Sequence, residues 1–188
     1  MPELTVEGLE DVERGLGELR RILLPEGMRR TLKGVGMIAE RRILSSFRKE
    51  TAPQHVAPVV RAQQAAGRPW KPLAASTLAA RRKRGRGAKI LQDTGAGAAS
   101  VGMNVGTDQV EIGIGLEYMG YQHGGTDPYD IYPRTKQALR FIGADGQWVT
   151  RSHVHHPGLD PRPMVGVDDQ DIDGMGLFVI GQMREAVS

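Results

Sequence analysis

The hydrophobic positions of the first fifty residues repeat with the period of an α-helix. Five apolar residues are spaced by three and four positions, which places them on one stripe of a helix: Leu9, Val12, Leu16, Leu19 and Leu23. Pro25 ends this pattern, and a second stripe begins just after it. We predict that this second helix buries one face made of Met28, Leu32, Val35, Ala39, Ile43 and Phe47.

Apolar periodicity is lost between Glu50 and Pro72, where Ala, Gln, Pro and Arg predominate. Such a stretch is typical of a long loop or a flexible arm that becomes ordered only in an assembly. The following segment, Leu73 to Arg84, can form a short helix that ends in a basic tail. We therefore treat residues 50–89 as a basic loop or arm.

The centre of the chain changes to the two-residue period of β-strands. Val110, Ile112 and Ile114 alternate with Glu111 and Gly113, and we expect Tyr118 to His123 to continue this sheet. Next, Ala138 to Ile142 and Trp148 to Val154 flank a Gly-Ala-Asp-Gly connection, which predicts a β-hairpin. Together these segments give three or four antiparallel strands.

The last predicted element is a helix. Apolar residues recur at helical spacing in Ile172, Met175, Val179 and Met183, and acidic residues that favour a helix N-terminus precede them. The fold class is therefore α+β, a small antiparallel sheet packed with N-terminal and C-terminal helices in a single domain, 1–188. Its regions are an N-terminal helical region (1–49), the basic arm (50–89), a β-rich core (90–166) and a C-terminal helix (167–188).

Composition narrows the possible functions. The chain has no cysteine, which excludes disulfides and thiolate metal sites. The apolar runs do not predict a signal peptide or a membrane-spanning segment, so we expect no membrane partner. The net charge is only +3, but Thr51 to Gln92 contains no Asp or Glu.

This acid-free segment is expected to meet an anionic partner or an acidic surface, because its cations otherwise repel one another. A solvated basic loop is the ordinary alternative, and a nucleic-acid-binding module using residues 61–89 is a functional one. We also expect the loop from Tyr118 to Tyr132 to contact neighbouring molecules. The candidate interface residues are Trp70, Arg81, Arg82, Lys83, Arg84, Arg86, Tyr118, Tyr121, Tyr129 and Tyr132.

Two constellations could carry chemistry. Asp93-Thr94-Gly95 invites the hypothesis of a dimeric aspartic protease, in which two carboxylates share a proton; alternatively, Asp93 caps a turn or short helix. His153 and His155 fall on one strand face and His156 on the other, so a zinc site would need His123 as its third ligand. Histidines making ordinary hydrogen bonds are the alternative, and we predict no metal and no cofactor.

Several short sequences occur in an order that resembles the Mu-like phage virion morphogenesis family. They span about Phe47 to Gly166 and comprise Trp70-Lys71-Pro72-Leu73, Ile90-Leu91-Gln92-Asp93-Thr94-Gly95, Tyr118 through Gly125, Ala138-Leu139-Arg140-Phe141, His155-His156-Pro157-Gly158 and Pro161-Arg162-Pro163. The chain departs from the family pattern at Ala96-Gly97-Ala98, where a larger apolar residue is usual, and at Met164, where Phe is usual. The resemblance also explains Asp93-Thr94-Gly95 as a structural turn.

The resemblance implies a non-enzymatic particle protein acting in tail completion or head-tail joining. It also implies a small α+β domain similar to tail-terminator and neck proteins, assembled with copies of itself as a hexameric ring. Further partners would be the tail tube, a tail terminator or head-connector proteins, with non-specific proximity to DNA. We expect assembly in the cytoplasm of the bacterial host and a final place at the virion neck or tail end, and three roles stay open: joining, termination or transient assistance.

Overall fold

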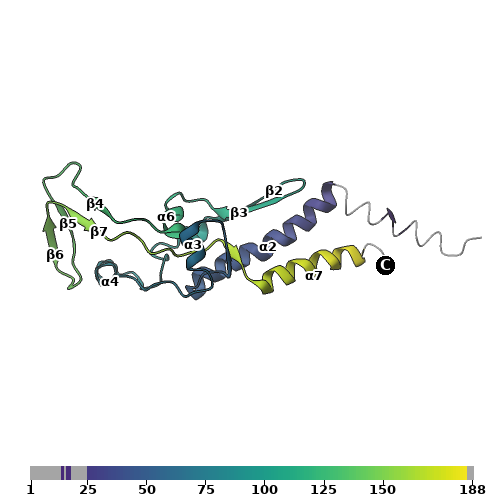
Figure 1. Ribbon diagram of the computed structural model, residues 1–188, viewed down its shortest axis with the longest axis horizontal. Coiled ribbons are helices and arrows are strands. Elements are labelled where there is room, and N and C mark those ends of the chain that lie inside the picture. The colour runs from purple at the N-terminus through teal and green to yellow at the C-terminus, as the bar shows by residue number, and fades with distance from the viewer. Residues whose placement is uncertain (1–13, 15, 18–24, 186–188) are drawn as a thin grey trace, which may run out of the picture. The chain divides into compact units, whose positions relative to one another are not determined.

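The computed structural model describes residue 14, residues 16–17 and residues 25–185 (Figure 1). Its helices are α2 (Pro25–Lys49), α3 (Val60–Gln64), α4 (Ala75–Lys83), α5 (Ala96–Ala99), α6 (Tyr118–Gly124) and α7 (Asp169–Glu185). Its strands are β1 (His55–Val56), β2 (Val101–Val105), β3 (Val110–Ile114), β4 (Tyr129–Ile131), β5 (Leu139–Ile142), β6 (Trp148–Arg151), β7 (Val154–His156) and β8 (Gly166–Val167). The α+β class is confirmed.

The chain folds as two compact units. Unit 2 consists of Arg42–Gly102 and Gly113–Asp168, and unit 1 consists of Met103–Ile112 with the described residues up to Arg41 and from Asp169 onward. The predicted helices after Pro25 and at the C-terminal end are confirmed as α2 and α7. The helix predicted at 9–23 lies outside the described residues, apart from positions 14, 16 and 17, which are helical.

The strands form four two-stranded sheets, where one sheet of three or four strands was predicted. β1 pairs with β8, β2 with β3, β4 with β7 and β5 with β6. The predicted β5–β6 hairpin is confirmed, with Leu139 opposite Arg151 and Ile142 opposite Trp148. Residues Val154 to His156, predicted to extend this hairpin, instead form β7 and pair with β4.

The predicted strand at Tyr118 to His123 is wrong, because this segment forms helix α6. Met119 and His123 are its buried residues, and a spacing of four residues places two side chains on one face of a helix. The aromatic residues suggested a strand, but their positions do not alternate with polar ones. Tyr118 and Tyr121 lie on the exposed side of the same helix.

Residues 50–89 contain more structure than the sequence suggested. They include β1, α3 and the predicted helix at the end of the segment, α4. Ala52, Pro53, Ala62 and Trp70 are buried, so the segment contributes to the core of unit 2. Short elements of two to five residues carry too few positions to show a period, which is why the sequence pattern missed them.

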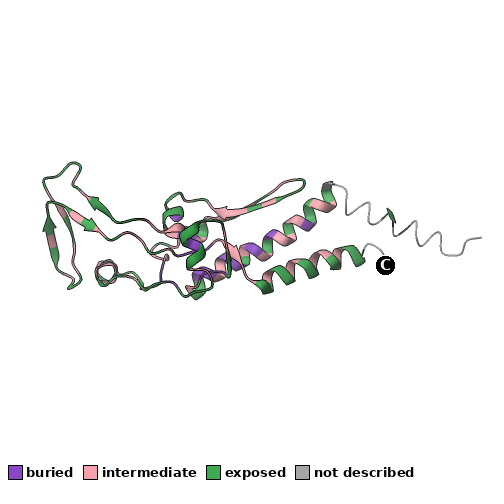
Figure 2. Ribbon diagram, viewed as in Figure 1, coloured by how far each residue is buried: buried purple, intermediate pink, exposed green. Residues whose placement is uncertain are grey.

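The core of unit 2 gathers around the second half of α2. Its largest fully buried side chains are Phe47, Ile43, Met164, Pro53 and Pro163. The Trp70 ring lies edge-on to Phe47 with ring centroids 6.0 Å apart, and its Nε1–H donates to the Pro163 carbonyl at 2.9 Å. Figure 2 shows the buried residues on α2, α3 and α6 and in the nearby loops of this unit.

A buried ion pair joins the two ends of unit 2. The Arg42 Nη2–H donates to Asp168 Oδ1 at 3.1 Å, and the Arg42 Nε atom lies 2.7 Å from Oδ2 in the same ion pair. The Gln54 backbone N–H donates to the same carboxylate at 2.7 Å. Burial alone would raise the pKa of Asp168, but the hydrogen bonds from Arg42 and Gln54 and the charges of Arg42 and Lys49 outweigh it and lower that pKa.

Unit 1 is held by close contacts at glycine. A Cβ atom on Gly34 of α2 would lie 2.2 Å from the Phe178 ring of α7, and one on Gly36 would lie 2.9 Å from Val110. These two glycines therefore let α7 and the β2–β3 hairpin approach α2. No residue of α7 is buried. Among all the described helices, none is long and apolar enough to cross a lipid bilayer.

Candidate functional site

The basic segment of unit 2 wraps around Asp93. Arg81, Arg84 and Arg86 bring guanidinium nitrogens to 3.5, 3.9 and 3.9 Å from the Asp93 carboxylate. The buried Arg81 also donates to the Lys89 carbonyl at 2.6 Å, and Arg86 donates to the Asp93 carbonyl at 2.8 Å. This carboxylate therefore ties the end of α4 to the loop that follows it.

The surroundings of Asp93 differ from those of a protease aspartate. A catalytic pair needs two carboxylates that share a proton, whereas Asp93 faces three guanidinium groups. The expected capping role of Asp93 is also wrong, since α5 has no side-chain cap and the Ala96 backbone N–H bonds to the Thr94 hydroxyl at 3.3 Å. Gly95 has a φ of 76°, a left-handed conformation that favours glycine and lets the chain turn.

Two further cations of the acid-free segment also meet acids from outside it. Arg61 forms an ion pair with Asp127, and Lys71 forms one with Asp160 at 3.0 Å. The carboxylates of Asp93, Asp127 and Asp160 therefore neutralise part of the charge excess within unit 2. Arg82 and Lys83 are exposed in the last turn of α4 and have no acidic partner among the described residues.

Trp70 is a core residue, with 5% of its surface exposed. Its ring packs on Phe47, so its side chain is not presented to a neighbouring molecule. Arg81 is likewise buried against Asp93. Of the candidate interface residues, those that reach the surface are Arg82, Lys83, Arg84, Arg86, Tyr118, Tyr121, Tyr129 and Tyr132.

The four candidate tyrosines are all exposed, but they fall on two elements. Tyr118 and Tyr121 belong to α6, whereas Tyr129 lies on β4 and Tyr132 just after it. The Tyr129 ring stacks on His156 with centroids 4.9 Å apart, and the Tyr132 ring stacks on His153 at 5.8 Å. Histidines thus order the exposed tyrosines of the β4–β7 sheet.

The histidines do not converge on a metal site. His123 is buried in α6, whereas His155 is exposed on β7 and its Nδ1 lies 3.0 Å from Asp130. No group of three His, Asp or Glu side chains suited to a metal ion occurs among the described residues. The His123 Nδ1 accepts from the Met164 backbone N–H at 3.3 Å, so it holds two chain segments together.

Burial lowers the pKa of His123, and a hydrogen bond to the backbone of Ala57 only partly opposes this effect. Because Nδ1 accepts a hydrogen bond from the backbone, the neutral ring is the form that fits this position. His123 is therefore part of the packing of α6 and not a ligand at the surface.

A shallow groove lies beside α3 and α6. It is lined by exposed Val59, Val60 and Tyr121, by Gly124 and Gly125, and by the Arg61–Asp127 pair. Val60 has 73% of its surface exposed. The groove therefore presents apolar side chains to solvent within unit 2.

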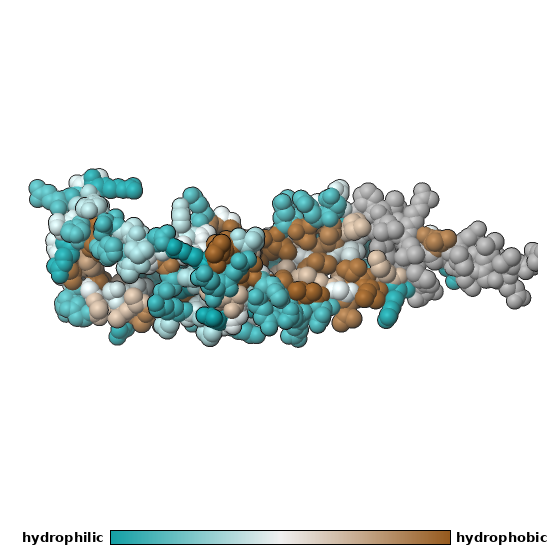
Figure 3. Space-filling model, in the orientation of Figure 1, coloured by the Kyte–Doolittle hydropathy of each residue, from teal (hydrophilic) through white to brown (hydrophobic). Residues whose placement is uncertain are grey.

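Two surfaces of the chain were missed by the sequence reasoning. On α7, Ile172, Leu177, Ile180 and Met183 are exposed; Ile172 and Met183 belong to the predicted apolar stripe, whereas Leu177 and Ile180 do not. Figure 3 shows hydrophobic residues at the surface in the region of α2 and α7. On the β5–β6 hairpin, Trp148 is 56% exposed, with Arg140 and Lys83 placed against its ring at 4.7 and 5.7 Å.

The comparisons with known proteins identify one family. Residues 8–179 match the family model described as the phage virion morphogenesis family, which covers most of the chain. No curated protein and no solved structure was found to match the chain.

Proposed function

Because the chain belongs to the phage virion morphogenesis family, we propose that it acts in tail completion or head-tail joining as a ring of identical subunits. The family supports a structural role in building the phage particle. The finer role rests on the surfaces that the chain leaves uncovered. Ring size, taken as six, follows the family resemblance.

The exposed apolar face of α7 is the observation that carries this proposal. Leu177 exposes 70% of its surface and Ile172, Ile180 and Met183 each more than 40%. Single exposed apolar residues are common, but a group of large ones on one helix marks an interaction site. The Gly176 position between them adds no side chain, so a neighbouring element can approach the helix closely.

A second apolar surface, the groove beside α3 and α6, makes a closed ring feasible. A head-to-tail contact joins two different patches, one from each copy, and closes into a ring when the rotation between copies is right. The α7 face and the α3–α6 groove are two such patches on one chain. Tyr118 and Tyr121 border the same region on α6 and would extend the contact.

The protein is proposed to work without a chemical step. The arginines around Asp93 support a structural role for its carboxylate. Purified protein incubated with capsid and tail proteins should yield no cleavage fragments. Cleavage that disappears in the Asp93→Ala variant would instead establish an aspartic protease.

Electron microscopy of particles assembled without this protein tests the role. Full heads beside separate tails of normal length are expected for a joining protein, whereas overlong tails are expected for a terminator. Either result supports the proposal and distinguishes its two forms. Normal infectious particles would refute it.

Native mass spectrometry of the purified chain tests the ring. The expected spectrum shows one dominant closed oligomer across a range of concentrations, because heterologous contacts close at a fixed number of copies. A chain that stays monomeric at high concentration, alone and with tail proteins, would contradict ring formation.

A further inference from the structure

Two exposed cations of unit 2 meet where α4 contacts the β5–β6 hairpin, and further exposed cations precede this hairpin in the chain. Helix α4 contacts β5, and the Lys83 ammonium at the end of α4 lies 5.7 Å from the Trp148 ring on β6. The Arg140 guanidinium on β5 lies 4.7 Å from the same ring. Residues about sixty positions apart in sequence thus build one surface, which the pattern of residues 61–89 alone could not reveal.

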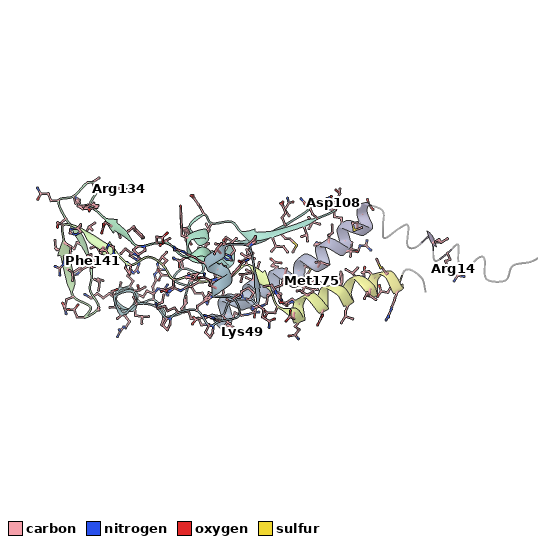
Figure 4. All side chains as sticks on the ribbon, in the orientation of Figure 1. Arg14, Lys49, Asp108, Arg134, Phe141 and Met175 are labelled. Atoms are coloured by element: carbon pink, nitrogen blue, oxygen red, sulfur yellow. The ribbon has the colours of Figure 1, made fainter. Side chains whose placement is uncertain are left out.

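We name this the cationic surface and define it by five exposed residues: Arg82, Lys83, Arg134, Lys136 and Arg140. Arg134 and Lys136 lie in the segment that connects β4 to β5. Figure 4 labels Arg134 in this segment and Phe141 on the neighbouring hairpin. None of the five has an acidic partner among the described residues.

The acidic residues of the hairpins are already engaged. The Asp130 carboxylate lies 3.0 Å from the His155 ring, and Asp145 accepts from the Gln147 backbone N–H at 2.9 Å. Near the basic segment, Asp93 faces Arg81, Arg84 and Arg86, and Asp127 and Asp160 pair with Arg61 and Lys71. The five cations therefore keep their charge available for an external anion.

We propose that the cationic surface binds the phosphate backbone of double-stranded DNA. Cations spread over a helix end and a hairpin match the repeating charge of a duplex, where one phosphate charge occurs about every 1.7 Å of helix axis. The Trp148 ring has two cations against it, which helps to hold them in place. Recognition through phosphates carries no sequence preference.

This inference is independent of the ring, since a monomer carries the whole surface. It differs from the nucleic-acid-binding module predicted from residues 61–89, because Arg61, Lys71, Arg81, Arg84 and Arg86 are paired with acids of the chain. Of the five cations of the cationic surface, Arg140 lies on the hairpin, and Arg134 and Lys136 lie in the segment before it.

Fluorescence anisotropy with a short fluorescein-labelled DNA duplex tests the proposal across a salt series. If each of the five cations neutralises one phosphate, the logarithm of the association constant should fall with the logarithm of salt concentration with a slope of about −4.5. The Lys83→Glu/Arg140→Glu variant should weaken binding at least about tenfold and make the slope shallower by about two.

A matched variant distinguishes the effect of losing the cationic surface from the effect of changing the net charge. Lys33→Glu/Arg41→Glu changes the net charge equally at two exposed positions of α2, and it should leave the slope unchanged. No binding by the wild-type chain at low salt, or an equal loss in the matched variant, would overturn the proposal. Equal binding of a poly-glutamate peptide would assign the surface to an acidic protein instead.

Trp148 provides a second readout that does not require charge reversal. Its exposed ring should change emission when DNA binds, whereas the other tryptophan, Trp70, is buried. The change should disappear in Trp148→Phe. If the emission change persists in that variant, the DNA binds elsewhere on the chain. In the anisotropy experiment, the single variants Arg82→Gln and Lys83→Gln should each make the salt slope shallower by about one.

Discussion

The two units of this protein are stabilised in different ways. Unit 2 encloses Phe47, Ile43 and Met164 and joins its ends through the buried Arg42–Asp168 pair. In unit 1, α7 buries none of its residues and meets α2 through the close approach of Phe178 to Gly34. Unit 2 thus removes large apolar side chains from water, whereas unit 1 keeps apolar area that another molecule can cover. The buried core and the exposed apolar face of α7 thus lie in different units of the chain.

The largest effect is expected from Phe47→Ala. This side chain has 1% of its surface exposed, and removing such a ring from a core costs about 3–5 kcal/mol of unfolding free energy. Urea denaturation measures the loss. Phe141→Ala on the exposed hairpin is the matched control and should cost far less, because Phe141 is 37% exposed. Equal losses would contradict the view that unit 2 is organised around α2.

The next effect is expected from Asp168→Ala, which leaves Arg42 buried without its carboxylate. Breaking a buried pair by removing one partner costs about 3 kcal/mol, and the partial exposure of Asp168 keeps the value at the lower end. Asp173→Ala on the exposed surface of α7 should change stability little. Thermal denaturation compares the two, and an unaffected Asp168→Ala would show that the pair does not hold unit 2.

Two glycine-to-alanine changes in unit 1 are expected to shift the free energy of unfolding in opposite directions. Gly34→Ala should lower the free energy of unfolding by about 1–3 kcal/mol, because its new methyl group meets the Phe178 ring. Gly176→Ala should gain about 0.5–1 kcal/mol, since open space surrounds that position and alanine favours a helix. Denaturation of both variants in parallel tests the packing of α2 on α7; equal signs would argue against it.

Acid should weaken unit 2 in two separate ranges. The lowered pKa of His123 means that the unfolded chain binds the proton more readily, so unfolding free energy should fall as the pH drops below 6.5, by up to about 1.4 kcal/mol per pH unit. This slope should vanish in His123→Gln and persist in His153→Gln. The lowered pKa of Asp168 adds to the free energy of unfolding at neutral pH. This contribution is lost at lower pH than that of His123, as the pH falls below the ordinary aspartate range.

The smallest effect on stability is expected from Leu177→Ser/Ile180→Ser. Both side chains are exposed on α7, so the free energy of unfolding of the monomer should change by less than about 0.5 kcal/mol each. The oligomer, in contrast, should dissociate in native mass spectrometry. A variant that assembles normally would remove the α7 face from the proposed ring contact.

Long periodic segments were predictable from the sequence. Short elements, and the pairing of strands that are distant in sequence, were not. The apolar repeats of α2 and α7 and the turn residues of the β5–β6 hairpin identified those elements. α6 was mistaken for a strand because seven residues with two tyrosines fit either period. The β4–β7 pairing joins segments that lie far apart, and local patterns carry no information about such partners.

The candidate site was only partly predictable for the same reason. Charge along the sequence marked Arg81 to Arg86, but the acid that engages three of these residues follows at Asp93. Trp70 was expected at an interface because aromatic residues are common there, yet it packs on Phe47. Trp148 and Arg140 were not among the candidate interface residues, since their relation to Lys83 exists only in the folded chain.

The Arg42–Asp168 bond has a further consequence for variation between related chains. Unit 2 begins at Arg42 and ends at Asp168, so the bond clamps its first and last residues to each other. The β5–β6 hairpin lies between them in the chain and carries none of the core residues, so we expect that its length can change while the entry and exit points stay in register. We therefore expect related chains to differ in this hairpin and to keep the clamp together with the core residues Phe47 and Ile43.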